Sequence, residues 1–69
     1  MESNEVDYMT EKVMIQVSIE EFSRLQTYML SLPDKNSETY EVMKQRYIEL
    51  KVILTAFGLN LTELDRVKE

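Results

Sequence analysis

The stretch that decides the fold is residues 37–57, SETYEVMKQRYIELKVILTAF. Apolar side chains recur in it at alternating spacings of three and four residues, which places them on one side of an α-helix. They are Tyr40, Met43, Tyr47, Leu50, Leu54 and Phe57. The same rhythm reaches Leu61 and Leu64, beyond Gly58. We therefore predict a helix over residues 37–57 with a seam like that of a coiled coil.

A shorter helix is predicted over residues 18–32, ahead of the long one. Ser18 and Glu21 have the spacing of a capping box, which satisfies backbone amides at the start of a helix. Pro33 disfavours helix in the residue before it, and residues 33–36 have a length that commonly joins antiparallel helices. We therefore predict a mainly α fold, a helical hairpin. Its predicted core residues are Phe22, Leu25, Met29, Tyr40, Met43, Tyr47, Leu50 and Leu54.

The N-terminal segment divides into two parts. Residues 1–11 carry four acidic side chains and no basic one, and we interpret them as a flexible arm ahead of a single domain over residues 12–69. Residues 12–17 place β-branched residues at every second position, which is typical of a short strand. A lone strand lacks ladder partners, so this prediction implies pairing with another chain. The alternative is an extension that runs into the first helix.

The C-terminal segment begins with a signal that ends a helix. Gly58 is the only glycine of the chain, and it fits the left-handed position that follows a helix, with Leu59 folding back on the last turn. Asn60 and Glu63 then have the spacing of a second capping pattern. Residues 61–68 are therefore a candidate short third helix.

The size of the chain limits what it can do alone. At 69 residues it lies in the range where a single core is marginal without disulfides, a metal or association. It has neither Cys nor His, which excludes disulfides and thiolate or imidazole metal sites and leaves association as the supplement. The longest apolar-leaning run, residues 52–59, is too short to span a bilayer, and the acidic N-terminus is unlike a secretory signal. We expect a cytoplasmic, oligomeric protein that binds no metal and does not insert into a membrane.

No motif in the chain carries catalytic chemistry. Ser18 and Ser37 are explained as helix caps, and a single glycine cannot form a phosphate cradle. Glu20 and Glu21 are adjacent, so on a helix they diverge by about 100° and cannot form a facing acid and base pair. We expect no enzyme activity, no cofactor and no small-molecule substrate. The net charge of -5 lies in the flanks of a neutral body, which disfavours binding to nucleic acid.

The long helix carries a second apolar stripe besides its seam. Between residues 47 and 59 only two side chains are charged, and one short helix cannot cover both sides of that segment. We therefore predict that the segment binds a protein partner or further copies of the chain. The predicted contact residues are Ile48, Val52, Ile53, Ala56 and Leu59. The alternative is that the predicted strand and the C-terminal segment fold back over this stripe.

Residues 33–57 also follow the pattern of a known group of helical hairpins. The matching features are the breaker at Pro33, the run Thr39-Tyr40-Glu41-Val42-Met43, then Leu50 and the apolar end at Ile53, Leu54 and Phe57. In these features the chain resembles the small type III secretion needle-chaperone family. The resemblance covers under half of the chain. It implies a non-enzymatic chaperone that pairs with a tetratricopeptide-like partner holding an aggregation-prone needle subunit. Apart from the resemblance, an adaptor is also compatible with the predicted partner-binding segment.

The predicted order of strand, helix and helix gives a different hypothesis, because it resembles ribbon-helix-helix regulators. In that alternative two copies pair their strands, and Lys12, Met14 and Gln16 face the bases of a DNA major groove. Such proteins present cationic strands, whereas here one lysine lies beside an acidic segment. A third hypothesis is a phage-type inhibitor that docks on a host enzyme through an exposed apolar face.

Overall fold

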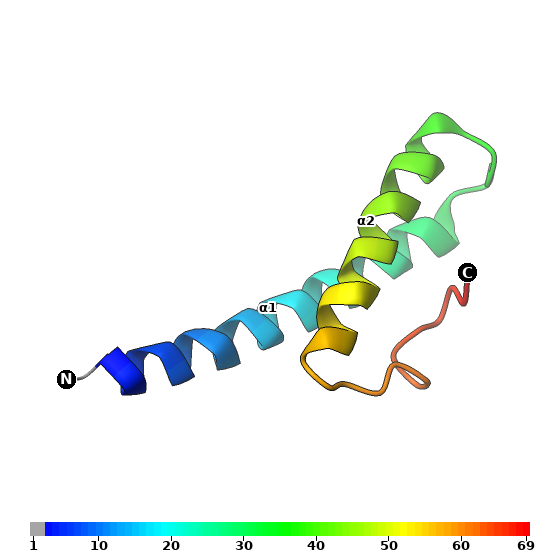
Figure 1. Ribbon diagram of the computed structural model, residues 1–69. Coiled ribbons are helices and arrows are strands. Elements are labelled where there is room, and N and C mark those ends of the chain that lie inside the picture. The colour runs from blue at the N-terminus through cyan, green and yellow to red at the C-terminus, as the bar shows by residue number, and fades with distance from the viewer. Residues whose placement is uncertain (1–2) are drawn as a thin grey trace.

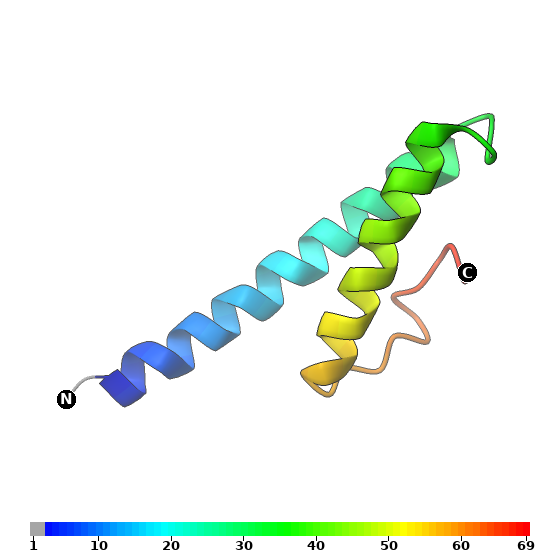
Figure 2. The same cartoon turned by 45° about the horizontal axis from the view of Figure 1, so that its top comes forward.

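The computed structural model describes the backbone of residues 3–69 and the side chains from Thr10 onward. It contains two helices, α1 (Ser3–Ser31) and α2 (Glu38–Ala56), followed by a tail without regular secondary structure over residues 57–69. The helices run antiparallel, which confirms the predicted hairpin (Figure 1). The molecule is elongated, with extents of 51 × 21 × 15 Å, because α1 continues well beyond the end of α2 (Figure 2).

Both ends of α2 are fixed by local hydrogen bonds that the sequence predicts. At its start, the hydroxyl of Ser37 accepts a hydrogen bond from the amide of Tyr40 at 3.1 Å. At its end, Gly58 has a φ of 89°, and the amide of Leu59 donates to the carbonyl of Leu54 at 3.1 Å. Leu59 also packs against the core, so this end is the left-handed cap with its apolar contact.

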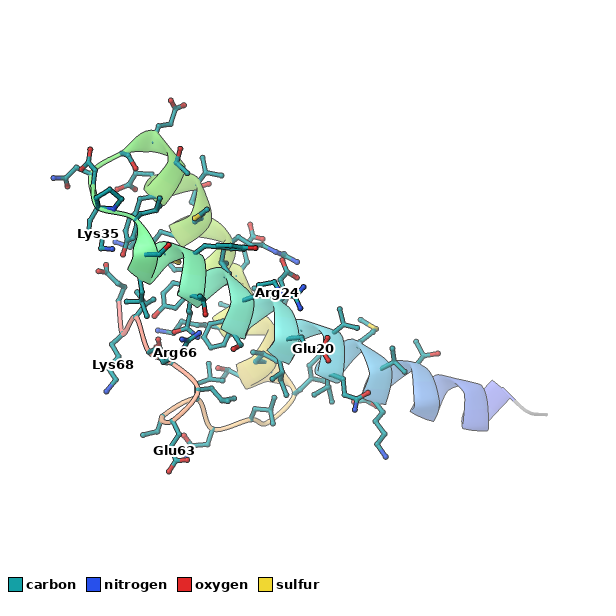
Figure 3. The ribbon with its side chains drawn as sticks, turned by 180° about the vertical axis from the view of Figure 1, so that it is seen from behind. Glu20, Arg24, Lys35, Glu63, Arg66 and Lys68 are labelled. Atoms are coloured by element: carbon teal, nitrogen blue, oxygen red, sulfur yellow. The ribbon has the colours of Figure 1, made fainter. Side chains whose placement is uncertain are left out.

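The loop between the helices supplies the end of α1 with a cation. The ammonium group of Lys35 donates hydrogen bonds to the carbonyl oxygens of Met29 at 2.8 Å and Leu32 at 2.6 Å. The last carbonyls of a helix have no hydrogen-bond donor within the helix, and they carry partial negative charge. The ammonium group of a lysine donates hydrogen bonds to them and balances that charge. Lys35 also lies 5.5 Å from the centroid of the Tyr40 ring, at the closed end of the hairpin (Figure 3).

The core lies where the second half of α1 faces α2. The rings of Phe22 and Tyr47 stack with centroids 5.6 Å apart and planes 9° from parallel. The buried hydrophobic residues are Phe22, Met29, Tyr40, Tyr47, Leu50 and Leu54. All six were predicted core residues, and the other two, Leu25 and Met43, are half-buried at the edge of the same cluster. The predicted seam is therefore confirmed.

The N-terminal half of the chain differs from the prediction. α1 begins at Ser3 instead of Ser18, so residues 12–17 are helical, and residues 3–11 are helical rather than a flexible arm. Residues 1 and 2 lie outside the described residues. The physical reason is that Ile15 precedes Ile19 and Phe22 at spacings of four and three, so one helical seam passes through the alternating segment. No glycine or proline interrupts it before Pro33.

The tail also differs, because residues 61–68 form turns rather than a third helix. The tail nevertheless returns along the hairpin and packs three half-buried side chains, Leu61, Leu64 and Val67, against the core. It thus acts as a third layer on one face of the two helices. Such a layer increases the apolar surface that the hairpin buries and thereby its stability, because two helices alone leave much of each apolar stripe in water.

Gln26 holds the tail in this position. Its side chain is polar, yet it is fully buried on α1, on the same helical stripe as the apolar residues Phe22 and Met29. Its amide nitrogen donates to the carbonyl oxygen of Leu64 at 2.9 Å, and its carbonyl oxygen accepts from the amides of Arg66 and Val67. One side chain therefore satisfies three backbone groups of an irregular segment that is partly buried.

The guanidinium group of Arg66 adds contacts on the outside of the same junction. It donates to the carbonyl oxygen of Ser23 and, at 3.0 Å, to the hydroxyl of Thr27, both on α1 (Figure 3). Among the described side chains, every buried nitrogen or oxygen has a hydrogen-bond partner. The tail is thus attached to α1 mainly through polar groups, and it covers apolar groups beneath them.

Leu50→Ala is expected to lower the free energy of unfolding by about 2 to 5 kcal/mol, because Leu50 is fully buried and alanine would leave a cavity. The measurement is urea denaturation followed by circular dichroism. Val42→Ala is the control, since Val42 is exposed on the same helix and should change stability by less than about 1 kcal/mol. Equal losses in the two variants would reject the described core.

Gln26→Leu is expected to loosen the tail, because leucine has a similar volume but leaves three backbone groups of the tail without partners. Unsatisfied buried polar groups cost about 1 to 3 kcal/mol each. The measurement is the rate of tryptic cleavage after Arg66 under native conditions, which should rise.

Gln45→Leu is the matched control for that experiment, because Gln45 is an exposed glutamine on α2. It should leave the cleavage rate after Arg66 close to that of the wild type. If both leucine variants are cleaved at the wild-type rate, Gln26 does not hold the tail.

Candidate protein-binding surfaces

An apolar stripe remains uncovered along the outer edge of α2. We call Ile48, Val52 and Ala56 the outer stripe, since they lie four residues apart and share one side of the helix. Ile48 is 46% exposed, Val52 is 64% exposed, and Ala56 is exposed too. The stripe forms an apolar depression with the neighbouring side chains of the helix and the last residue of the tail. Its lining residues are Ile48, Lys51, Val52, Thr55, Ala56 and Glu69.

The other two predicted contact residues lie elsewhere. Ile53 is half-buried and, at about 100° per residue, faces the opposite side of α2 from Ile48. Leu59 is half-buried against the core, because the cap at Gly58 turns it back onto the hairpin. The structure therefore brings together three of the five predicted residues. It also brings the tail beside them without covering them, so the predicted alternative of a covered stripe is not what the structure has.

A polar network fixes the end of the tail beside the outer stripe. The hydroxyl of Tyr47 donates to a carboxylate oxygen of Asp65 at 2.6 Å and accepts from the amide of Glu69 at 3.0 Å. The ammonium group of Lys51 lies 3.0 Å from the other oxygen of Asp65, and it donates to the carbonyl oxygen of Glu69 at 3.1 Å. The side-chain carboxylate of Glu69 pairs with Lys44 at 2.8 Å. Together these bonds shape one wall of the depression.

The ionisation of this network matches its geometry. Burial by itself raises the pKa of Asp65, but hydrogen bonds from Tyr47, the amide of Lys68 and Lys51 together hold that pKa below its ordinary value. Burial raises the pKa of Tyr47, and the bond to Asp65 adds to this effect. The bond to Asp65 also raises the pKa of Lys51. An ionised Asp65 facing a neutral Tyr47 and a charged Lys51 is therefore the stable state near neutral pH.

A second surface lies on the face of the hairpin away from the tail. The tail contacts α1 on the side of Ser23 and Gln26, whereas Glu21 lies on the other side of that helix. There the guanidinium group of Arg46 donates to both carboxylate oxygens of Glu21, at 2.8 and 3.0 Å, in a two-pronged bridge between the helices. This hydrogen bonding lowers the pKa of Glu21.

We call this side the open face. Around the Glu21 bridge it presents apolar side chains from both helices that are half-buried or exposed. By the helical period, these residues lie on the same side of their helices as Glu21 or Arg46: Met14, Val17, Leu25 and Tyr28 of α1, and Met43, Ile53 and Phe57 of α2. Val17, Leu25 and Tyr28 line one shallow depression, and the charged side chains of Glu20, Glu21 and Arg24 complete its lining. Sequence reasoning did not identify this surface, because it joins edges of two helices that lie far apart in the chain.

The residues that the DNA-binding alternative requires are not brought together. Lys12, Met14 and Gln16 are exposed, but they lie on α1, where residues two apart diverge by about 200°. Met14 therefore faces away from the other two. Among the side chains that the structure describes, no group of three acidic residues is arranged to hold a metal ion.

Comparison with models of protein families, with curated proteins and with solved structures finds no match for this chain. Over the described residues, neither helix is long and apolar enough to cross a membrane. The surfaces themselves are therefore the basis for an account of function.

Asp65→Asn is expected to lower the free energy of unfolding near pH 7 and to matter less as the pH falls. The pKa of Asp65 is lowered in the folded state, so its ionised form stabilises the fold above about pH 3.9, the ordinary value in an unfolded chain. That contribution is lost as the pH falls through the lower folded pKa. The measurement is urea denaturation of both proteins between about pH 2 and 7.

Glu63→Gln provides the control, because it removes the same charge from an exposed position of the same tail. Its difference from the wild type should stay small throughout this pH range. A wild-type advantage over Asp65→Asn that persists undiminished at the lowest pH would contradict the described network.

Proposed function

We propose that this chain is a small non-enzymatic protein-binding module that acts as a chaperone, adaptor or inhibitor. It binds through the outer stripe of α2. The observation that carries the proposal is the exposure of Val52 and Ile48. In a chain this small, each large apolar side chain left in water is a sizeable part of the apolar surface that could have been buried. Burying a side chain of this kind contributes about 1.5 to 3 kcal/mol, so a partner that covers both gains a useful part of its affinity there.

The shape of the outer stripe favours an apolar-faced helix as the partner. Its residues are spaced by four, which forms the ridge that a second helix accepts in its groove. The small side chains of Thr55 and Ala56 at one end allow close approach of a backbone. Lys51 and Glu69 flank the apolar strip with one charge of each sign, which suits a polar rim.

The fixed tail supports this proposal. Asp65 and Glu69 are bonded to Tyr47 and Lys51, so the wall of the depression is in place before a partner arrives. A surface that is already ordered loses less conformational entropy on binding than one that must be assembled. The resemblance of residues 33–57 to needle chaperones is consistent with such a module and is part of the proposal.

The regulator hypothesis has less support. It requires an extended segment that pairs between two copies, and residues 12–17 are helical in the described backbone. It also requires a cationic surface, while the net charge of the chain is -5. We therefore do not propose nucleic-acid binding.

Val52→Glu is expected to abolish partner binding while the hairpin persists, because it places a charge in the middle of an apolar contact but lies outside the core. The measurement is affinity capture with the tagged full chain from a lysate of its source cells. Bound proteins are compared between wild type and variant, and circular dichroism checks the fold.

Val42→Glu is the matched control. Val42 is 62% exposed on the same helix, so the substitution adds the same charge at an equally exposed valine outside the outer stripe. A protein recovered in stoichiometric amounts by wild type and Val42→Glu, but not by Val52→Glu, supports the proposal. If every recovered protein binds all three chains equally, the outer stripe is not a binding surface.

A further inference from the structure

α1 is longer than the hairpin that supports it. Its 29 residues span about 43 Å, whereas the 19 residues of α2 span about 28 Å. α2 is thus ten residues shorter than α1, and it also diverges from α1 toward its C-terminal end, so the first half of α1 projects from the body (Figures 1 and 2). Every side chain from Thr10 to Met14 is exposed. A helical segment of this length is marginal in water by itself, so its stability depends on something that packs against it.

The projecting half shares an apolar line with the open face. Met14 and Val17 lie three residues apart, and Leu25 and Tyr28 lie three residues apart further along the same helix. At about 100° per residue, all four fall within an arc of about 80° on α1. Met14, Val17 and Tyr28 are each more than half exposed. One continuous stripe thus runs from the unsupported half of α1 onto the hairpin.

We propose that the open face is an interface between two copies of this chain, with their α1 helices packed antiparallel. The stripe is complementary to itself under a twofold rotation centred near Glu21. In that register Met14 lies opposite Tyr28 of the second copy, and Val17 lies opposite Leu25. The projecting half of each copy then covers the open face of the other, and each receives the support that it lacks alone.

The charge at the centre of this interface is already balanced. Two copies of Glu21 would repel each other across the twofold axis if they were unpaired. Each is instead held by the guanidinium group of Arg46 from its own α2, through both carboxylate oxygens. Arg46 also bonds to Glu49 of its own helix, so both groups of charge at the centre are paired within each copy. The centre of the contact is therefore a row of matched charges with apolar side chains on either side.

This inference concerns a different surface from the outer stripe and does not rest on the proposed function. Both surfaces can be occupied together, because the outer stripe lies at the outer edge of α2 beside the tail, and the open face lies on the side away from the tail. A self-paired chain would then present two outer stripes.

The test compares Val17→Glu with Val13→Glu by sedimentation equilibrium of the full chain over a wide range of concentrations. Val17 is 55% exposed and Val13 is 53% exposed on the same helix, but only Val17 belongs to the stripe. Wild type and Val13→Glu are expected to reach the mass of two chains. The dissociation constant of Val17→Glu is expected to be at least about tenfold higher, and its thermal midpoint should equal that of the wild type at concentrations where both are single chains.

A second measurement tests the register. The described chain contains no cysteine, so Val17→Cys combined with Leu25→Cys introduces the only thiols. Positions 17 and 25 lie about 12 Å apart along one helix, too far for a disulfide within one chain. Oxidation is expected to link two chains. The pair Val13→Cys and Leu25→Cys is the control and should link them much less.

Three results would overturn the proposal. The first is a wild type that remains a single chain at the highest concentration. The second is an equal loss of self-association in Val13→Glu and Val17→Glu. The third is a dimer that survives Val17→Glu and dissociates in Val52→Glu, which would assign self-association to the outer stripe and leave the proposed function intact.

Discussion

The side-chain amide of Gln26 is the interaction on which the rest of the structure depends. Two helices that meet along one seam leave apolar groups exposed on both faces of the contact, and a chain of 69 residues has little else to cover them with. The tail supplies that cover on one face, but its backbone is irregular and needs hydrogen-bond partners. Gln26 provides three of them from a fully buried position. The apolar contacts of Leu61, Leu64 and Val67 follow from this attachment.

The position of the tail decides which surfaces remain available. Because the tail lies on one face, the opposite face keeps its apolar side chains around the bridge between Glu21 and Arg46. Glu69 is bound to Tyr47 and Lys51 on the inner side of α2, so it lies beside the outer stripe and leaves Val52 exposed. The position of the tail thus leaves two separate apolar surfaces exposed, each with polar side chains at its border. The proposed contacts with a partner and with a second copy rest on these two surfaces.

The sequence predicts the seam of the hairpin well, because the pattern from Tyr40 to Leu54 has one period and clear ends at Ser37 and Gly58. It fails over residues 12–17, where β-branched residues fit a strand by alternation and a helix by the spacing from Ile15 to Phe22. The prediction of a helix over residues 61–68 is also wrong. The capping pattern at Asn60 favours a helix there, but hydrogen bonds between the tail and α1 hold the backbone in turns instead. The one signal for those bonds was a glutamine at a position that the helical period assigns to the core. Of the predicted contact residues, Leu59 is turned onto the core by the cap at Gly58, and Ile53 lies apart from the outer stripe because the helical period separates it from Ile48 by about 140°.

Native-state hydrogen exchange of the wild-type chain tests the central claim most directly. The account predicts that the backbone amides of Arg66 and Val67, which donate to the buried Gln26 carbonyl, exchange more slowly than the same amides in a free peptide of residues 59–69. Their protection should be lost in Gln26→Leu while the amides of α2 near Leu50 stay protected. Exchange of Arg66 and Val67 at the rates of the free peptide would contradict the account, because the tail would then not be attached to the hairpin.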